Sequence, residues 1–245
     1  MAPPSVLVYL ISLSRAINFF VAVAVDIEPF GDNYRREWGG DHVTLLNQGT
    51  QLTSLGYNEE SSKNHDEVDF EFLGSNGPPY ILNTNVFAQD SGNREQQFSL
   101  WFDPSLAFHD YDILWNQKQI VFFVDKVPIR VFKNYKIKGL RFPKLPMYVE
   151  ASLWNGTGWL GGVDWSGGPF LAGYRGFEIN GCPYDNYTSN PAKCESPGYD
   201  WNAPKYWQLD PQQLKMYKDV RNKHLIYDYC NSKLAINFPE CKFVS

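Results

Sequence analysis

The chain has 245 residues and a formal net charge of −5 with no basic run, which argues against nucleic acid as a partner. Aromatic residues make up 16% of it. That is more than a core of this size needs, so sugar-stacking surfaces are one use for the surplus and simple packing is the other. The length suits a single sandwich or barrel domain.

The first 24 residues are expected to be a signal peptide. Residues 5–25 are nearly all apolar, interrupted only by Arg15, and Ala22-Val23-Ala24 has the small-x-small form of a cleavage site. A membrane anchor is the alternative, but an apolar stretch of 21 residues with a charge in its middle is marginal for spanning a bilayer. We therefore expect a secreted, extracellular chain that has no membrane contact after cleavage.

Short runs of β-branched and aromatic residues then alternate with turn residues. The first is Val43–Leu46, and residues 47–64 follow as a turn-rich stretch without clear periodicity. Later runs cover residues 65–74, 80–87, 97–102, 111–115, 119–124, 127–132, 147–153 and 174–179. Asp125-Lys126 looks like a tight hairpin, although Gly would be expected in the commonest turn. Strands at this spacing predict an all-β, antiparallel sandwich.

The last quarter of the chain changes character. Residues 182–209 are typical of a loop, whereas Asp210 offers an N-cap and Pro211 suits the first position of a helix. Residues at helical spacing follow, so we predict a helix over 211–224. We assign residues 25–180 to the sandwich and residues 181–245 to an extension of the same domain.

Four cysteines, all in this last quarter, agree with secretion. An even number indicates two disulfides with three possible pairings, and we favour the local one, Cys182–Cys194 and Cys230–Cys241. The absence of a Cys-x-x-Cys pair argues against structural zinc, and we expect neither a metal nor a cofactor. Asn155 and Asn186 begin glycosylation sequons, of which the second, in a polar loop, is the better candidate.

The strongest functional signal is the stretch from His65 to Gly74. Acidic and apolar residues alternate with strand periodicity, so each kind has its own face: Glu67, Asp69 and Glu71 on one, and Val68, Phe70 and Phe72 on the other. Like charges along one strand repel, and each resists losing its water. A solvated acidic face or a calcium site would explain the pattern plainly. A set of catalytic carboxylates is the hypothesis that we favour.

Cleavage of a glycosidic bond with retention takes a nucleophile and an acid/base whose carboxyl groups lie about 5–5.5 Å apart. On a strand, the Cα atoms of Glu67 and Glu71 would be about 13 Å apart. Two Glu side chains that lean together over a twisted, concave sheet would shorten this distance. Asp69, between them, could hydrogen-bond the nucleophile, and the crowding should separate the pKa values of the three carboxyls. The spacing permits the chemistry without proving it.

This stretch, His65-Asp66-Glu67-Val68-Asp69-Phe70-Glu71-Phe72-Leu73-Gly74, resembles the active-site motif of the plant xyloglucan endotransglucosylase/hydrolases, a branch of glycoside hydrolase family 16. Other blocks resemble that family in the same order, at residues 84–87, 93–96, 100–104, 113–116, 127–134, 151–155 and 226–230. The likeness runs from about Pro29 to Cys241.

The resemblance implies a concanavalin-like β-jelly-roll with a cleft across its concave face, with Glu67 as nucleophile, Glu71 as acid/base and Asp69 as helper. It also implies that Glu71 binds substrate, and that other sugar-binding residues line the two sides of the cleft: Asn83, Asn85, Asn93 and Glu95 on the donor side, and Trp159, Leu160 and Gly162 on the acceptor side. The expected partners are xyloglucan and its oligosaccharides in the cell wall, or apoplast, and we expect a monomer.

The chain also departs from that family. Between Gln51 and Leu52 it lacks several strands of the sandwich, roughly 30–40 residues at usual strand and loop lengths, and such a loss should expose sheet edges. Asn83 stands where the family usually has Gln, and the Arg expected inside the last cystine loop is absent. A catalytically inactive wall-glucan-binding relative, or a truncated remnant, is therefore the alternative to an active enzyme.

Overall fold

Strands provide most of the regular structure. The computed structural model describes residues 18–22, 43–46, 51–55, 65–73, 78–145, 147, 151, 171–175, 180–182 and 191–243. For residues 18–22, 43–46, 51–55, 171, 175, 191 and 192 it describes the backbone only. The strands form two sheets, a smaller one and a larger one.

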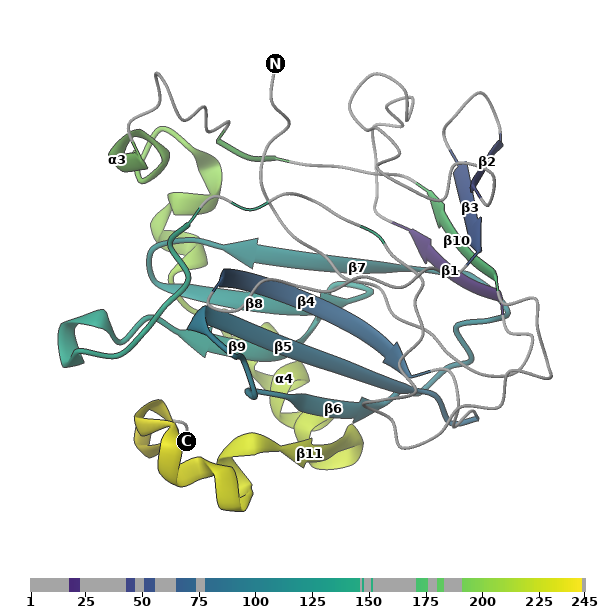
Figure 1. The fold of residues 1–245 in the computed structure, drawn as a ribbon. Coiled ribbons are helices and arrows are strands. Elements are labelled where there is room, and N and C mark those ends of the chain that lie inside the picture. Colours follow the sequence, from purple (N-terminus) through teal and green to yellow (C-terminus); the bar gives the residue numbers. More distant parts are fainter. Residues whose placement is uncertain are drawn as a thin grey trace.

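The smaller sheet has four strands in the order β11-β6-β5-β4 (Figure 1). They are formed by Leu225–Asp228, Gln96–Ser99, Ile81–Asp90 and His65–Leu73, respectively. Every pairing in this sheet is antiparallel. The acidic stretch is thus β4, at one edge of the described sheet, and β11 of the C-terminal extension is at the other edge.

The larger sheet has the order β2-β3-β10-β1-β7-β8-β9. In chain order its strands are β1 (Asn18–Ala22), β2 (Val43–Leu46), β3 (Gln51–Leu55), β7 (Phe108–Trp115), β8 (Gln119–Val124), β9 (Val127–Lys133) and β10 (Leu171–Arg175). β1 pairs parallel with both β10 and β7. The other pairings in this sheet are antiparallel.

Several strands differ from the sequence prediction, among them β11, where no strand was predicted. β1 lies inside the segment expected to be a signal peptide, and its parallel pairing departs from the expected antiparallel sandwich. Parallel neighbours need a long connection between them, and the chain from β1 to β7 is long enough to provide one. β3 falls where no periodicity was found. Of the strand expected over 147–153 the structure describes only Met147 and Ala151, and neither is in a strand.

The core lies between the two sheets. The apolar side chains of β4 are buried, and Phe70 meets Tyr111 of β7 and Phe122 of β8 edge-on, with ring centroids 5.7 and 5.3 Å apart. Phe72 meets Tyr111 in the same way at 4.9 Å. This packing anchors β4 through its apolar face, which leaves the acidic face directed away from the core.

The hairpin between β8 and β9 turns at Asp125 and Lys126, as the sequence predicted. Both residues have positive φ, 49° and 64°, which is the conformation of a type I′ turn. Lys126 stands where the commonest turn of this type has Gly, whereas the first position suits Asp125, because Asp tolerates positive φ better than most residues do. Its carboxylate also accepts a hydrogen bond from the backbone N–H of Asp110 at 2.9 Å.

The C-terminal extension contains the predicted helix, α4, over Pro211–His224. Asp210 and Gln213 form a capping box at its start, and α4 packs against β9 and β11. A one-turn helix, α3 (Pro191–Cys194), and a series of short 3₁₀ turns make up most of the remainder: Asp200–Asn202, Pro204–Tyr206, Tyr229–Asn231, Lys233–Asn237 and Pro239–Phe243. Within the described residues, no helix is long and apolar enough to cross a membrane.

Two disulfides close loops in this extension. Cys182 is bonded to Cys194 and Cys230 to Cys241, which is the local pairing favoured above. The described part of the chain contains no free cysteine. The candidate glycosylation residues Asn155 and Asn186 lie outside the described residues.

Candidate active site

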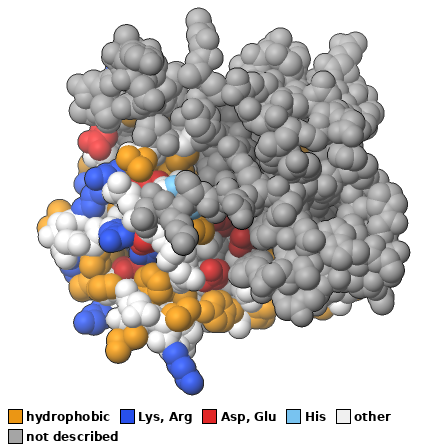
Figure 2. Space-filling model, in the orientation of Figure 1, with side chains coloured by type: hydrophobic (Ala, Val, Ile, Leu, Met, Phe, Trp, Pro, Cys, Tyr) orange, Lys and Arg blue, Asp and Glu red, His pale blue; other side chains and the backbone are white. Residues whose placement is uncertain are grey.

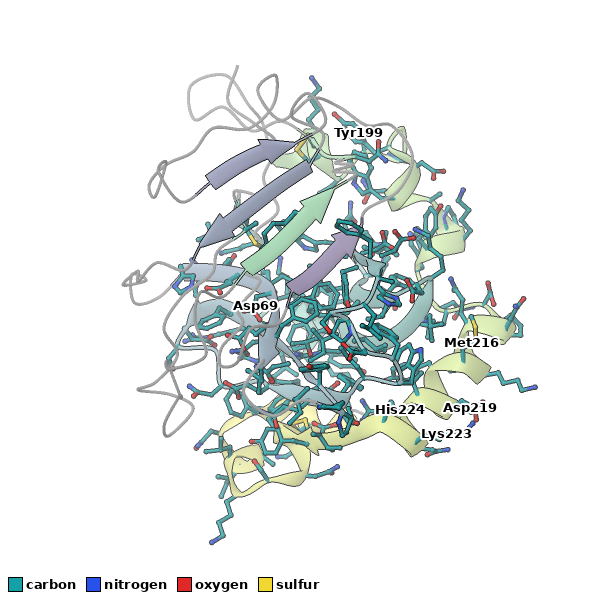
Figure 3. All side chains as sticks on the ribbon, turned by 90° about the vertical axis from the view of Figure 1, so that its right-hand side faces the viewer. Asp69, Tyr199, Met216, Asp219, Lys223 and His224 are labelled. Atoms are coloured by element: carbon teal, nitrogen blue, oxygen red, sulfur yellow. A yellow bond between two sulfur atoms is a disulfide. The ribbon has the colours of Figure 1, made fainter. Side chains whose placement is uncertain are left out.

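The acidic face of β4 forms the centre of the candidate site. Glu67 and Asp69 are buried, Asp69 completely, and Glu71 is partly buried. Figure 3 shows Asp69 among packed side chains on the smaller sheet, well away from the labelled residues of α4. Red acidic side chains are visible near the middle of the face seen in Figure 2. Carboxyl groups in such a place must be paired, protonated or used in chemistry.

The register between β4 and β5 places polar residues opposite these carboxyls. Asn85 pairs with Asp69, and Asn83 pairs with Glu71, while Phe87 pairs with Glu67. Directly opposed residues of an antiparallel pair share a face. Two of the residues expected to bind sugar therefore lie on the same face as the expected catalytic set.

Asp69 is held by the backbone of the neighbouring strand. Its Oδ1 accepts a hydrogen bond from the N–H of Asn85 at 2.9 Å. Burial raises the pKa of Asp69 well above its usual value, and the charge of Glu67 raises it further, against weaker lowering by Arg130 and by the Asn85 N–H. Asp69 thus binds a proton more tightly than an ordinary Asp does, and it lies next to Glu67 on the same face.

Glu71 also has a raised pKa. Burial is the main cause, and the negative charge of Asp69 adds to it, whereas the hydrogen bond from Asn83 acts in the opposite direction. Asn83 Nδ2 donates that bond to Glu71 Oε2. Among the described residues, no group donates to the buried Asn83 Oδ1, so this acceptor lies next to Glu71 without a hydrogen bond.

Glu67 is contacted from its own strand. The imidazole Nε2 of His65 meets Glu67 Oε2, two residues away and on the same face. The His65 ring stacks on Phe87 of β5, with centroids 4.8 Å apart and an interplanar angle of 24°. The stack fixes the plane of the imidazole and, with it, the direction from which His65 approaches the carboxylate.

The loop from Ser91 to Glu95, which we call the donor-side loop, extends this face toward β6. Asn85 Nδ2 donates to Glu95 Oε1 at 3.3 Å, which brings Glu95 into the polar group around β4 and β5. Asn93 is exposed, and its Nδ2 donates to the backbone oxygen of Ser91 at 3.0 Å. Glu95 is therefore joined to the polar face of β4 and β5, and Asn93 lies two residues before it on the exposed part of the loop.

The acceptor side cannot be placed in the same way. Trp159, Leu160 and Gly162 lie outside the described residues. In the part of the chain that the structure describes, no group of three or more His, Cys, Asp or Glu could hold a metal ion.

Sequence reasoning missed three residues of this face: His65, Phe87 and Gln97. The position of His65, two residues before Glu67, was a sufficient signal, because period two puts both on one face. Gln97 pairs with Asn83 and so shares its face, which follows only from the register between β5 and β6. Phe87 likewise needed the register between β4 and β5.

Comparison with known families agrees with this geometry. Residues 46–167 match the model described as Glycosyl hydrolases family 16, and residues 195–241 match the model described as Xyloglucan endo-transglycosylase (XET) C-terminus. The first match contains β4, β5 and the donor-side loop, and the second contains α4, β11 and the Cys230–Cys241 bridge.

Curated relatives match over most of their length. Xyloglucan endotransglucosylase/hydrolase protein 3 of Arabidopsis thaliana is 39% identical, over 86% of this chain and 88% of that protein. Xyloglucan endotransglucosylase/hydrolase protein A of Phaseolus angularis is 39% identical, over 95% of each. A xyloglucan endotransglucosylase/hydrolase of Brassica oleracea var. botrytis is 40% identical, over 97% of this chain and 95% of that protein.

The lengths of these alignments bear on the missing segment. The alignments with the Phaseolus and Brassica relatives run over 282 and 287 positions, and the chain has 245 residues. Each alignment therefore includes positions of the relative that have no counterpart here, and the placement of the gap after Gln51 remains a prediction. With the two family models and these identities, the chain belongs to glycosyl hydrolase family 16 and, within it, to the xyloglucan endotransglucosylase/hydrolases.

Proposed function

We propose that this protein is a retaining xyloglucan endotransglucosylase and hydrolase, which cleaves the β-1,4-glucan backbone and passes the cut end to a xyloglucan acceptor or to water. The observation that carries the proposal is the acidic face of β4, on which two carboxyls with raised pKa values, Asp69 and Glu71, each lie opposite an Asn of β5. Family membership supplies the substrate class, since the relatives' names all specify xyloglucan.

In the first half of the reaction Glu67 attacks the anomeric carbon. The bond from that carbon to the leaving oxygen breaks, a glycosyl ester forms on Glu67, and Glu71 gives its proton to the leaving oxygen. A raised pKa suits this role, because it keeps Glu71 protonated until the oxygen needs the proton. The contact from His65 holds the Glu67 carboxylate toward the sugar face.

In the second half Glu71 acts as a base. A hydroxyl of the acceptor sugar, or of water, loses its proton to Glu71 while its oxygen attacks the anomeric carbon, and Glu67 leaves as a carboxylate. The raised pKa of Asp69 favours its protonated form, which can donate a hydrogen bond to the Glu67 carboxylate and stabilise its charge when Glu67 is free. Each half therefore returns the proton and the electron pair that the other half uses.

Four residues hold the donor sugar in this proposal: Asn83, Asn85, Asn93 and Glu95. The Glu95 carboxylate, which is partly exposed, is an acceptor suited to sugar hydroxyls. Trp159, Leu160 and Gly162 hold the acceptor on the other side of the cleft. How well that side binds sugar and excludes water sets the ratio of transfer to hydrolysis.

The finer features of the fold follow the same family. We assign the two sheets to a jelly-roll whose concave face is the acidic face of β4, with some sandwich strands missing after Gln51. The chain acts in the cell wall as a secreted monomer that is glycosylated at Asn186 or Asn155. Sequencing the N-terminus of the secreted protein tests the cleavage. If residues 1–24 are removed, the secreted protein also loses β1 from the larger sheet.

Purified protein, xyloglucan and a fluorescent xyloglucan oligosaccharide test the activity directly. We expect label to enter high-molecular-mass glucan, and glucan chains to shorten when the oligosaccharide is omitted. Glu67→Ala should abolish both. If folded wild-type protein gives neither result, the enzyme proposal is wrong.

The alternative is a wall-glucan-binding relative without catalysis, and the unmatched alignment positions of the relatives favour it. It predicts that wild-type protein and Glu67→Ala bind xyloglucan equally and that neither alters it. The same assay with the variant therefore separates the two functions.

A further inference from the structure

The donor-side loop, Ser91–Glu95, has an irregular backbone. Gly92 and Asn93 have φ values of 67° and 61°, and Gln89 just before them has 55°. A Cβ on Gly92 would lie 2.7 Å from the ring of Phe87, so this position needs Gly for space as well as for conformation. A segment in such a strained conformation persists only when its surroundings determine it.

The side chain of Arg94 makes contacts that hold the donor-side loop in this conformation. Its side chain is 4% exposed, and its two terminal nitrogens donate to both carboxylate oxygens of Asp90, at 3.0 and 2.9 Å. Its Nε donates to Glu240 Oε1 at 2.7 Å, and its Cζ lies 4.8 Å from the centroid of the Phe238 ring. A buried guanidinium with two carboxylates and a ring face is held in one orientation.

Two of the contacts on this loop come from residues next to the Cys230–Cys241 bridge. Glu240 precedes Cys241, and the backbone N–H of Tyr229, just before Cys230, donates to the backbone oxygen of Glu95 at 3.1 Å. We call residues 230–241 the second cystine loop. The bridge thus ties together the two points at which the C-terminal extension holds the donor-side loop.

On its inner side the loop is bonded to the candidate active site. The backbone N–H of Arg94 donates to Asn85 Oδ1 at 3.0 Å, and Asn85 Nδ2 donates to Glu95 Oε1 at 3.3 Å. The backbone N–H of Asn85 in turn holds Asp69 Oδ1 at 2.9 Å. A continuous series of contacts therefore runs from Glu240 through Arg94 and Asn85 to Asp69.

We infer that Arg94 is a positioning residue, and that the second cystine loop acts through Glu240 and Arg94 to hold Asn85 and Glu95 in the arrangement that binds the donor sugar. The identity of the sugar rests on the function proposed above, whereas the contacts among Glu240, Arg94 and Asn85 are independent of that function. The first bridge makes a different contact: the backbone oxygen of Cys194 accepts from Asn202 Nδ2 at 2.8 Å. It therefore serves as a matched control, with a separation of 12 residues against 11 for the second bridge.

The first test separates binding from chemistry. In Glu240→Ala, the KM for donor xyloglucan should rise about tenfold while kcat changes less than about twofold, since a residue that contacts neither sugar nor the reacting atoms acts only by positioning the residues that bind the donor. Glu240→Gln keeps the acceptor oxygen and should recover most of the loss. A fall in kcat with an unchanged KM would overturn the inference, because the defect would then lie in the chemical step.

The second test does not depend on activity. Hydrogen exchange should be faster at residues 85–95 in the double variant Cys230→Ser, Cys241→Ser and in Glu240→Ala, but not in Cys182→Ser, Cys194→Ser. Equal exchange at residues 85–95 in both double variants, or an equal rise over the whole chain, would show only a loss of stability and would overturn the inference. If wild-type protein neither transfers nor hydrolyses glucan, the proposed function fails, and the exchange result still decides the role of Arg94.

Discussion

The imidazole of His65 contacts the carboxylate of Glu67 on the same face of β4, and its ring lies against Phe87 of the neighbouring strand. His65 therefore orients the carboxylate of the proposed nucleophile, and Phe87 orients the ring of His65. Placement of a reacting group within about 1 Å matters in such a site, because a displacement of that size can cost on the order of 100-fold in rate.

The first prediction concerns His65. Both His65→Phe and His65→Gln should lower kcat about tenfold with little change in donor KM, because the nucleophile is less well directed while sugar contacts remain. Phe87→Leu leaves His65 in contact with Glu67 and should lower kcat less. Transfer rates at saturating acceptor measure this effect, and full kcat in His65→Phe would show that the contact with Glu67 has no role in catalysis.

The second prediction concerns Glu71. Glu71→Gln should lower the rate about 10²–10⁴-fold with xyloglucan as donor, since a general acid/base is lost. An aryl glucan-oligosaccharide whose leaving group needs no proton should form the glycosyl-enzyme at nearly the wild-type rate. Because the pKa of Glu71 is raised, wild-type activity should fall on the alkaline side as Glu71 loses its proton. Glu71→Gln should lack that fall; an unchanged pH profile would assign the acid to another group.

Much of this site follows from sequence alone, for a definite reason. Period-two alternation fixed the acidic face of β4, and the capping signal of Asp210 placed α4 correctly, because both are local patterns. The contacts of Arg94 with Glu240, and of Arg130 with Thr84, join residues 146 and 46 positions apart. No local pattern indicates such pairs, so the support behind the site had to come from the structure.

The third prediction concerns Arg130 of β9, which is fully buried behind this site. It donates to the backbone oxygen of Thr84 at 2.7 Å and to that of Arg94 at 2.6 Å. Arg130→Met should cost about 3 kcal/mol, because two buried carbonyls lose their partner. Arg141, which is largely exposed and donates to Gln89 O at 2.9 Å, gives the control, and Arg141→Met should cost less than about 0.5 kcal/mol. Urea unfolding measures both, and equal midpoints would contradict the prediction.

The fourth prediction concerns Asp69 and stability. Its raised pKa means that the folded state binds a proton more tightly than the unfolded chain. Stability from this group is therefore present below the ordinary pKa of about 4 and is lost as pH rises toward the folded value. Because Asn does not ionise, the Asp69→Asn variant avoids this loss of stability. It should be more stable than wild type at pH 7 and equally stable at pH 3.5, while its activity falls. Melting temperatures at the two pH values check this, and a variant that is less stable at pH 7 would contradict it.

The fifth prediction has the opposite sign and uses Asp90. Burial alone would raise the pKa of Asp90, but hydrogen bonds and charge from Arg94 outweigh it and lower the pKa. Its contribution to stability is therefore present above a pH of about 4 and is lost as pH falls through the lower folded value. Asp90→Asn should cost about 2 kcal/mol at pH 7, since charge-assisted hydrogen bonds to Arg94 are lost, and nearly nothing at the lowest pH where the protein stays folded. The same melts compare both variants. If Asp69→Asn and Asp90→Asn changed stability in the same direction at pH 7, the pKa values of the two carboxyls would not be shifted in opposite directions, and both predictions would be wrong.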